Sequence, residues 1–362
     1  MRMFRLVLPA LITVATVLPA LAKTDAPLVD AVRSGDIAAV RALLDQGTAV
    51  DARLGDGSTA LQWAVHERRP AMVDLLLEAG ADVSLANRHG VSAVWLAAEN
   101  GDAGILERLL EAGADANRTM SGGETVLMTA ARTGDQETVR LLLERGADPN
   151  AREALRGQTA LMWAAAERHA DVVGPLVAAG ADVDDRSDAS FTPLMFAARL
   201  GDIETVDALL EAGADMHQTL PDGTSPLVVA VINAHYDLAV RLLERGADPN
   251  ASEQGWTALH QLVWTRRPNT NKNQHNPSPL QSGRVTDLEL VKALVLHGAD
   301  VNARQTKEPR DGYRNMLNRI DATPFLLAAK VVDLELMRLL LDLGADPLLT
   351  NEDGTTGLLV AA

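Results

Sequence analysis

The chain has 362 residues, of which 47% are apolar and 23% are charged, a balance typical of a folded protein rather than a disordered one. Its formal net charge of −16 argues against general binding to nucleic acid or to an anionic membrane, because both need a basic face. The chain contains no cysteine, which excludes disulfides, thiolate catalysis and zinc sites with cysteine ligands.

The first 22 residues have the features of an export signal. Arg2 and Arg5 precede an uncharged apolar run over residues 6–21, and the segment ends on small residues at the places that a signal peptidase reads. A membrane anchor is the alternative, but the run is shorter than the roughly 20 residues that cross a bilayer. We therefore expect residues 1–22 to be removed, the mature protein to have no stable membrane insertion, and its location to be periplasmic or secreted.

From residue 24 onward the sequence repeats with a period of about 33 residues. Each unit begins with a string of the form Thr-Pro/Ala-Leu-x-x-Ala-Ala, whose Thr or Ser we number as position 0. Each unit ends, usually 21 residues later, with a string of the form Leu-Leu-x-x-Gly-Ala-Asp. The units begin near residues 26, 59, 92, 125, 159, 192, 225, 257 and 323, and their glycines are Gly47, Gly80, Gly113, Gly146, Gly180, Gly213, Gly246, Gly298 and Gly344.

Each part of this motif has a physical role. The Thr or Ser at position 0 caps a helix through its side-chain oxygen, and a following proline such as Pro193 suits the first helical turn. Small residues such as Ala130 and Ala131 let a second helix, carrying Val139, pack closely on the first. The glycine, for example Gly146, then ends the second helix in the left-handed conformation.

This pattern resembles the ankyrin repeat, a turn followed by two antiparallel helices, over residues 24–362. The resemblance implies an all-α solenoid with nine full repeats and a truncated tenth. The family usually carries histidine at position 3, and only His260 matches. Met128, Met162 and Met195 occupy this position in other repeats, so we expect apolar packing in place of the usual polar network between turns.

Two insertions interrupt the period. Repeat eight carries about 20 extra residues between its helices, and the turn before repeat nine carries about 13. Both insertions have net positive charge, so we expect their arginines to face negative charge, either on a partner or on the acidic remainder of the chain. The expected segments are 1–22 (signal peptide), 23–264 (repeats one to seven and the first helix of repeat eight), 265–286 (basic loop insertion), 287–303 (second helix of repeat eight), 304–320 (basic turn insertion) and 321–362 (repeat nine and partial repeat ten).

No catalytic or metal-binding motif stands out. The sequence lacks GxSxG, GxxxxGK[ST], HExxH and EF-hand patterns, and its eight histidines are scattered. The aspartates that follow Gly-Ala recur once per repeat, so we interpret them as turn residues. We expect no enzymatic activity, no metal site and no cofactor.

The candidate partner-binding residues fall into three groups. Positions 4 and 8 of the first helices are expected to face a groove, although position 4 could instead pack on the neighbouring repeat. Trp256, His260 and Trp264 are spaced to line one helical face, although the tryptophans could merely cover the base of the loops. The arginines of the insertions form the third group. The candidates are Trp63, Trp163, Phe196, Leu200, Val229, Trp256, His260, Trp264, Arg266, Arg267, Arg310 and Arg314.

The resemblance implies a non-enzymatic scaffold that binds a protein partner through its concave groove and turn tips, in the bacterial envelope or outside the cell. We expect a monomer that binds no nucleic acid. Two other readings stay open. The chain could be the targeting module of a longer enzyme that continues past residue 362, or the aromatic groove could bind a saccharide or another small ligand.

Overall fold

The computed structural model describes residues 26–266, 283–308 and 317–361. All regular secondary structure in these ranges is helical, and the turns contain only isolated single-residue bridges, which confirms the expected all-α class. The predicted signal peptide and three candidate arginines (Arg267, Arg310 and Arg314) lie outside the described residues. The chain divides into two compact units, one ending at Asp182 and one beginning at Val183, and each is described by itself.

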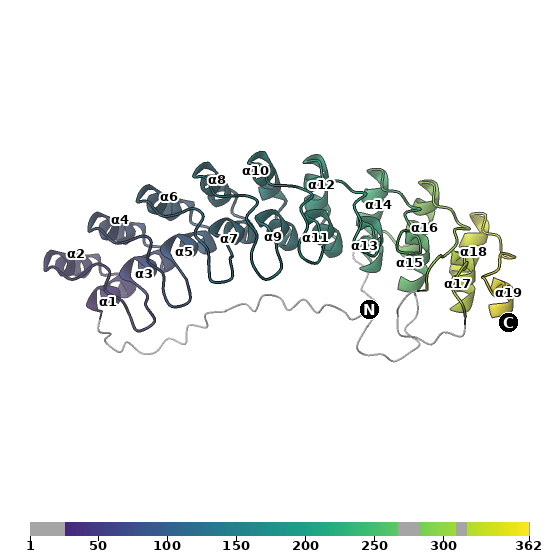
Figure 1. The fold of residues 1–362 in the computed structure, drawn as a ribbon, viewed down its shortest axis with the longest axis horizontal. Coiled ribbons are helices and arrows are strands. Elements are labelled where there is room, and N and C mark those ends of the chain that lie inside the picture. Colours follow the sequence, from purple (N-terminus) through teal and green to yellow (C-terminus); the bar gives the residue numbers. More distant parts are fainter. Residues whose placement is uncertain (1–25, 267–282, 309–316, 362) are drawn as a thin grey trace. The chain divides into compact units, whose positions relative to one another are not determined.

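The unit that ends at Asp182 consists of helix pairs. Figure 1 shows its odd-numbered helices in one row and its even-numbered helices in a second row. Each odd helix from α1 to α7 packs on the even helix that follows it and on the next odd helix. The elements are α1 (Pro27–Ser34), α2 (Ile37–Asp45), α3 (Ala60–His66), α4 (Pro70–Glu78), α5 (Ala93–Asn100), α6 (Ala103–Glu111), α7 (Val126–Thr133), α8 (Gln136–Glu144), α9 (Ala160–Glu167), η1 (Ala170–Val172) and α10 (Val173–Ala178).

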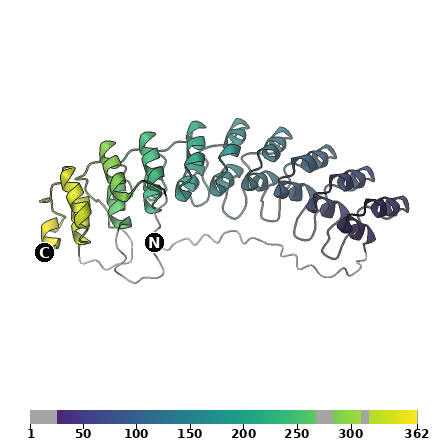
Figure 2. The same cartoon turned by 180° about the vertical axis from the view of Figure 1, so that it is seen from behind.

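The unit that begins at Val183 repeats this arrangement, which Figure 2 shows from behind. Here α11, α13, α15, α17 and α19 pack in sequence, and α14 packs on α16. The helices are α11 (Pro193–Leu200), α12 (Ile203–Glu211), α13 (Pro226–Ile232), α14 (Tyr236–Glu244), α15 (Ala258–Thr265), α16 (Asp287–Leu296), α17 (Pro324–Lys330), α18 (Leu334–Asp342) and α19 (Gly357–Ala361).

The helices begin where the side chains provide caps. At seven of the described first helices, the Thr or Ser at position 0 accepts a hydrogen bond from the backbone N–H three residues later, as at Thr192 and Met195. Proline occupies the first helical turn after three of these caps, as expected from the sequence. Aspartates such as Asp135 and Asp333 do the same for five of the second helices, so these short helices have a defined start.

The core lies between the two helices of each pair and between neighbouring pairs. Within repeat four, Leu127, Ala130 and Ala131 of α7 and Val139 and Leu142 of α8 have no exposed surface. Small alanines let the helices approach, and the leucines and valines fill the remaining space. This burial of apolar surface against neighbours, rather than any single helix, stabilises the array.

The glycine that follows four of the described first helices adopts a left-handed conformation and lies against a side chain from the next repeat. Gly134 has φ +74°, and the Nε2 atom of His169 lies 3.0 Å from the Arg132 carbonyl oxygen. Gly201 and His235 form an equivalent junction, with 3.0 Å from Nε2 to the Arg199 carbonyl oxygen. The imidazole rests so close to each glycine that no larger residue fits without displacing it.

The expectation that apolar packing replaces polar contacts between turns is wrong, because asparagines link the turns. The Asn150 side chain donates to the Gly180 carbonyl over 2.8 Å and accepts from the Asp182 N–H over 2.8 Å. Met128, Met162 and Met195 are buried as expected, and the asparagine hydrogen bonds link the turns in addition to this apolar packing. The same pair of bonds forms at Asn117, Asn250 and Asn302.

Candidate functional site

The two tryptophans at position 4 lie half-buried on the first-helix row of the unit that ends at Asp182. The Arg33 guanidinium lies 4.6 Å from the Trp63 ring centroid, and the Arg132 guanidinium lies 6.0 Å from that of Trp163. In both cases the arginine comes from position 7 of the preceding repeat. This cation–π contact covers part of each indole and fixes its orientation, and the indole nitrogen is buried, so only a part of the ring stays at the surface.

Position 4 is different in the other unit. Phe196 and Val229 are only 6% and 5% exposed, so they pack against neighbouring helices instead of facing a groove. Their expected role as partner-binding residues is therefore wrong, since almost none of their surface is available. Leu200 at position 8 is half-buried, and Arg199 beside it stacks 5.4 Å from the Phe196 ring centroid.

Repeat eight brings two tryptophans together and separates them from the histidine. The rings of Trp256 and Trp264 contact edge to face, with 5.2 Å between their centroids. The Arg319 guanidinium lies 5.8 Å from the Trp264 ring centroid. Arg319 belongs to the end of the second insertion, so Trp264 contacts the base of that loop. The expected role of Trp256 and Trp264 in binding a partner stays a prediction. His260 is fully buried, and its Nε2 atom donates to the Ala322 carbonyl over 3.1 Å. It holds two turns together and offers no surface to a partner.

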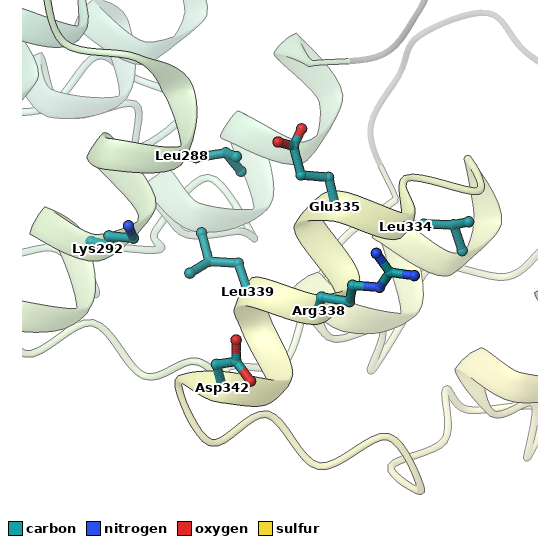
Figure 3. A pocket seen from close by; sticks show the side chains of 7 residues that line it. All are labelled: Leu288, Lys292, Leu334, Glu335, Arg338, Leu339 and Asp342. Atoms are coloured by element: carbon teal, nitrogen blue, oxygen red, sulfur yellow. The ribbon is translucent and has the colours of Figure 1, made fainter.

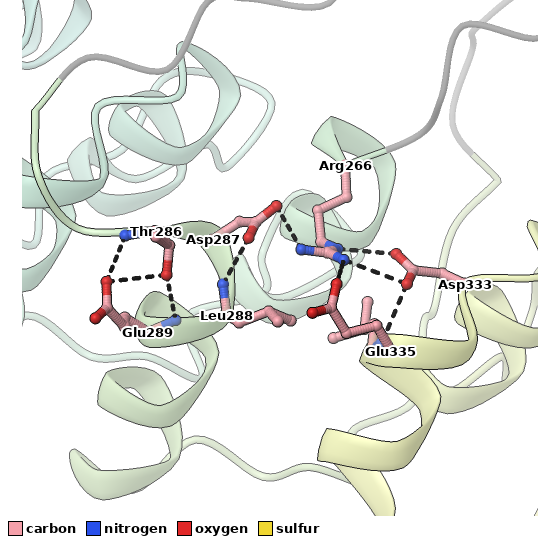
Figure 4. Close-up of polar contacts among 8 residues, drawn as sticks. Arg266, Thr286, Asp287, Leu288, Glu289, Asp333 and Glu335 are labelled. Carbon is pink, nitrogen blue, oxygen red and sulfur yellow. Dashed lines mark hydrogen bonds and ion pairs between the residues drawn. The ribbon is translucent and has the colours of Figure 1, made fainter.

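Arg266 forms the centre of a charged cluster, which we call the Arg266 cluster: Arg266, Asp287, Asp333 and Glu335. Its Nε atom lies 2.8 Å from Asp333 Oδ2, and its Nη2 atom lies 3.2 Å from Asp333 Oδ1 and 3.3 Å from Glu335 Oε2. A further ion pair joins Nη1 to Asp287. Figure 4 shows the guanidinium between the first residues of α16 and α18. Arg266 therefore faces negative charge, as expected, but within its own chain.

The pKa values reflect this environment. Burial lowers the pKa of Arg266, but hydrogen bonds to Asp333 and the charges of Asp287 and Asp333 outweigh it and raise the pKa overall. Burial raises the pKa of Asp333, yet its bonds to Arg266 and to the Leu336 N–H leave the pKa below its usual value. Burial, followed by repulsion from Asp287, raises the pKa of nearby Tyr236 to about 12. Arg266 and Asp333 are therefore both charged at neutral pH.

The cluster lies at the root of the first insertion, and a second contact fixes the far end of that insertion. Arg266, at the start of the insertion, pairs with Asp287, which directly follows its end. The Asp237 carboxylate of α14 accepts the backbone N–H groups of Arg284 and Val285 over 3.1 and 3.2 Å. Sequence reasoning missed these acids because they stand 21 to 69 positions from the cations or amides that they bind, and only the stacking of repeats brings them together.

A surface groove adjoins the cluster, and we call it the α16/α18 groove. It encloses about 420 Å³ and shares Glu335 with the Arg266 cluster. In Figure 3, Leu339 of α18 points toward Leu288 of α16 across the space between the two helices. Sequence analysis did not identify this groove. Its lining residues are Leu288, Lys292, Leu334, Glu335, Arg338, Leu339 and Asp342.

Over residues 26–266, 283–308 and 317–361, no three acidic or histidine side chains gather in a way that would hold a metal ion. None of the helices described has the length and apolar character needed to span a bilayer.

Comparisons with known proteins agree with the helix-pair architecture. A family model described as "Ankyrin repeats (3 copies)" matches residues 13–87, 72–153, 94–187 and 194–305. The crystal structure of the ankyrin repeat domain of Bcl-3, described as a unique member of the IkappaB protein family, superposes with a TM-score of 0.52 and 34% sequence identity. That match covers 57% of this chain and 94% of the other. No match was found among curated proteins.

Proposed function

Because the chain belongs to the ankyrin repeat family, whose arrays are protein–protein interaction modules, we propose that it is a binding scaffold of the cell envelope. In this proposal residues 1–22 direct export and are removed, and the mature chain acts as a monomer without enzymatic activity. The basic start, apolar run and small-residue end of this segment support export. Ankyrin arrays are typically non-enzymatic, which supports a role in binding.

The observation that carries this proposal is the surface around Trp63 and Trp163. Each indole is half-buried on a first helix of the same unit, and each has an exposed glutamate four residues later, Glu67 and Glu167. Tryptophan is among the residues that contribute most to protein interfaces. Because a stacked arginine already orders each ring, a partner that contacts it loses little additional side-chain entropy.

The partner expected here presents an apolar surface beside basic groups. Apolar side chains would cover the free parts of the two indoles, and lysines or arginines would approach Glu67 and Glu167. Charges at the rim of an interface mainly set the association rate and its dependence on salt, while the buried aromatics set most of the affinity. Binding by this surface should therefore slow as ionic strength rises.

Affinity capture from an envelope extract tests the proposal. We expect the wild-type chain and Trp95→Ala, which changes a tryptophan at position 3, to retain one partner, and Trp63→Ala with Trp163→Ala to lose it. The exposed pair Glu67→Lys and Glu167→Lys keeps the core intact, so we expect a folded protein with weakened capture. Equal capture by all variants, or capture from cytoplasmic extract alone, would reject the proposal. N-terminal sequencing of exported protein should begin at Lys23.

A further inference from the structure

The turn before α9 contains one residue more than other turns of the array. In six other turns a backbone N–H donates to the carbonyl four residues later, and the three residues enclosed by this bond form the tip: 55–57, 88–90, 121–123, 188–190, 221–223 and 352–354. In the turn before α9, the Glu153 N–H donates to the Gln158 carbonyl over 3.1 Å, so the tip consists of four residues, 154–157. The spacing from Gly146 to Gly180 is accordingly 34 residues instead of 33.

The four-residue tip carries a leucine that the other tips lack. Leu155 is 82% exposed, and none of the six three-residue tips contains a leucine, isoleucine, valine, methionine or aromatic residue. In Figure 1 the turns that precede α3, α5, α7 and α9 extend beyond the row of first helices, on the side away from the second helices. A single exposed leucine is common on protein surfaces, but this one stands on a projecting turn that is longer than its counterparts.

The tip is held in one conformation by a buried carboxylate. Glu153 is only 6% exposed, and its carboxylate accepts three backbone N–H groups of the turn over 2.6 to 3.1 Å, those of Leu155, Arg156 and Gln158. The Ala154 N–H donates to the Gly122 carbonyl of the preceding turn over 3.0 Å. Because the backbone around Leu155 is already ordered, a partner that binds the tip loses little additional conformational entropy.

The exposed charge of the tip is positive. Arg156 is exposed and forms no ion pair among the described residues. The neighbouring Glu153 carboxylate is committed to the turn, and Glu124 of the preceding turn accepts a hydrogen bond from a threonine hydroxyl. The exposed Asp148 stands eight residues before Arg156, near the end of α8, where it accepts the N–H of Asn150. The tip therefore presents a leucine beside a cation that no acid of the turn neutralises.

We propose that the turn before α9 inserts Leu155 into an apolar pocket of a protein partner, and that Arg156 pairs with a carboxylate at the rim of this pocket. Burial of the leucine supplies most of the affinity, because apolar surface leaves water. The charge pair directs the approach of the partner and makes association sensitive to salt. A nucleic acid or an anionic membrane fits less well, since one projecting cation is not a basic face.

This contact rests on the binding role proposed above but not on the tryptophan surface. Trp63 and Trp163 belong to first helices, and the partner groups expected beside them are basic. Leu155 and Arg156 belong to a turn, and the partner group expected beside them is acidic. Variants of the tip leave both indoles in place, so each of the two proposals can fail without the other.

The test is photo-crosslinking with the full chain in the cells that produce it. Benzoylphenylalanine replaces Ala154, which is exposed and is the first residue of the tip, so Leu155 and Arg156 stay unchanged. The matched control replaces Ser121, the exposed first residue of the preceding tip. We expect irradiation to join a protein to position 154 and not to position 121. Mapping of the product should identify an apolar segment of that protein with an aspartate or glutamate beside it.

Three variants of the crosslinking chain sharpen the test. Leu155→Ser should lower the crosslinked fraction about 10- to 100-fold, the effect of losing one buried leucine side chain. Its midpoint of unfolding in urea should not change, because the replaced side chain is exposed. Arg156→Glu should lower the fraction about tenfold, because like charges then meet at the rim. Arg140→Glu, which reverses an exposed charge on α8, should leave the fraction unchanged.

Several results would overturn the proposal. The absence of a product at position 154, or an equal product at position 121, would show that this tip is not a specific contact. An unchanged product with Leu155→Ser would show that the leucine is not the anchor. An unchanged product with Arg156→Glu, or a mapped segment without an acid, would show that no carboxylate lies at the rim. A product with a second copy of the chain or with lipid would exclude a separate protein as the occupant.

Discussion

Replacing Arg266 with methionine should destabilise the end of the array more than any exposed charge change. Methionine keeps the aliphatic stem but leaves Asp333, whose side chain is 13% exposed, without its cation. Removing one partner of a fully buried ion pair costs about 3–5 kcal/mol, while exposed pairs contribute about 0–1 kcal/mol. Because Asp287 and Glu335 are more exposed than Asp333 and can turn toward water, we expect a loss of about 2–3 kcal/mol.

Hydrogen exchange measures this loss where it occurs. The amides of Leu336 and Leu340, both buried in α18, report local opening of repeat nine. A loss of about 2–3 kcal/mol corresponds to exchange that is faster by about 30- to 150-fold. Asp333→Asn should have a similar effect while retaining the helix cap, and the double variant with Arg266→Met should cost less than the sum of the two single changes.

The matched control is Arg140→Met. Arg140 pairs with Glu137 over 3.6 Å, but the two side chains are 51% and 69% exposed, so the change should cost about 0.5 kcal/mol or less. If Arg266→Met accelerated exchange in α18 no more than Arg140→Met does in α8, the Arg266 cluster would not stabilise the fold. Additive costs in the double variant would likewise show that Arg266 and Asp333 are not coupled.

The remaining predictions concern single residues. Burial lowers the pKa of His260 to about 4, so the unfolded chain binds a proton at a higher pH than the folded one, and stability should fall by about 3 kcal/mol as pH drops from 6.5 to 4. His260→Gln, which copies Gln62 of repeat two, should remove this slope in acid titrations of unfolding, and an unchanged slope would contradict the assignment. Gly134→Ala should cost at least about 1 kcal/mol more in urea unfolding than Gly146→Ala, because both glycines have positive φ but only Gly134 faces His169; equal costs would show that the ring moves aside freely.

The sequence predicted the local structure well because local chemistry determines it. The Thr or Ser caps and the proline after them mark helix starts, and the glycines mark helix ends, without reference to distant residues. Thr192 and Pro193 begin α11 as expected, and Gly146 adopts φ +83°. Each of these features depends on a few neighbouring residues, which a single sequence displays directly.

The surface was harder to predict because it depends on how neighbouring repeats meet. Trp163 and Phe196 occupy the same position of their repeats, yet Trp163 is half-buried and Phe196 is buried. The positive charge of the insertions and the negative charge of the remaining chain predicted that Arg266 faces acids. They could not identify Asp333, which lies 67 residues later. Arg267 lies outside the described residues, so its predicted contact with a partner stays a prediction.

The junctions between first helices restrict the order in which repeats can be joined. At one kind of junction, the later repeat contributes His169 and the earlier one a glycine. At the other kind, Arg68 of the earlier repeat donates to the Asn100 carbonyl of the later one over 2.7 Å, and the later repeat has the small Asp102 at the matching place. If repeat two were joined directly to repeat five, Arg68 and His169 would compete for a space that holds one side chain. Joining repeat three to repeat five would instead set Gly101 there, so gain and loss of repeats is limited to compatible neighbours.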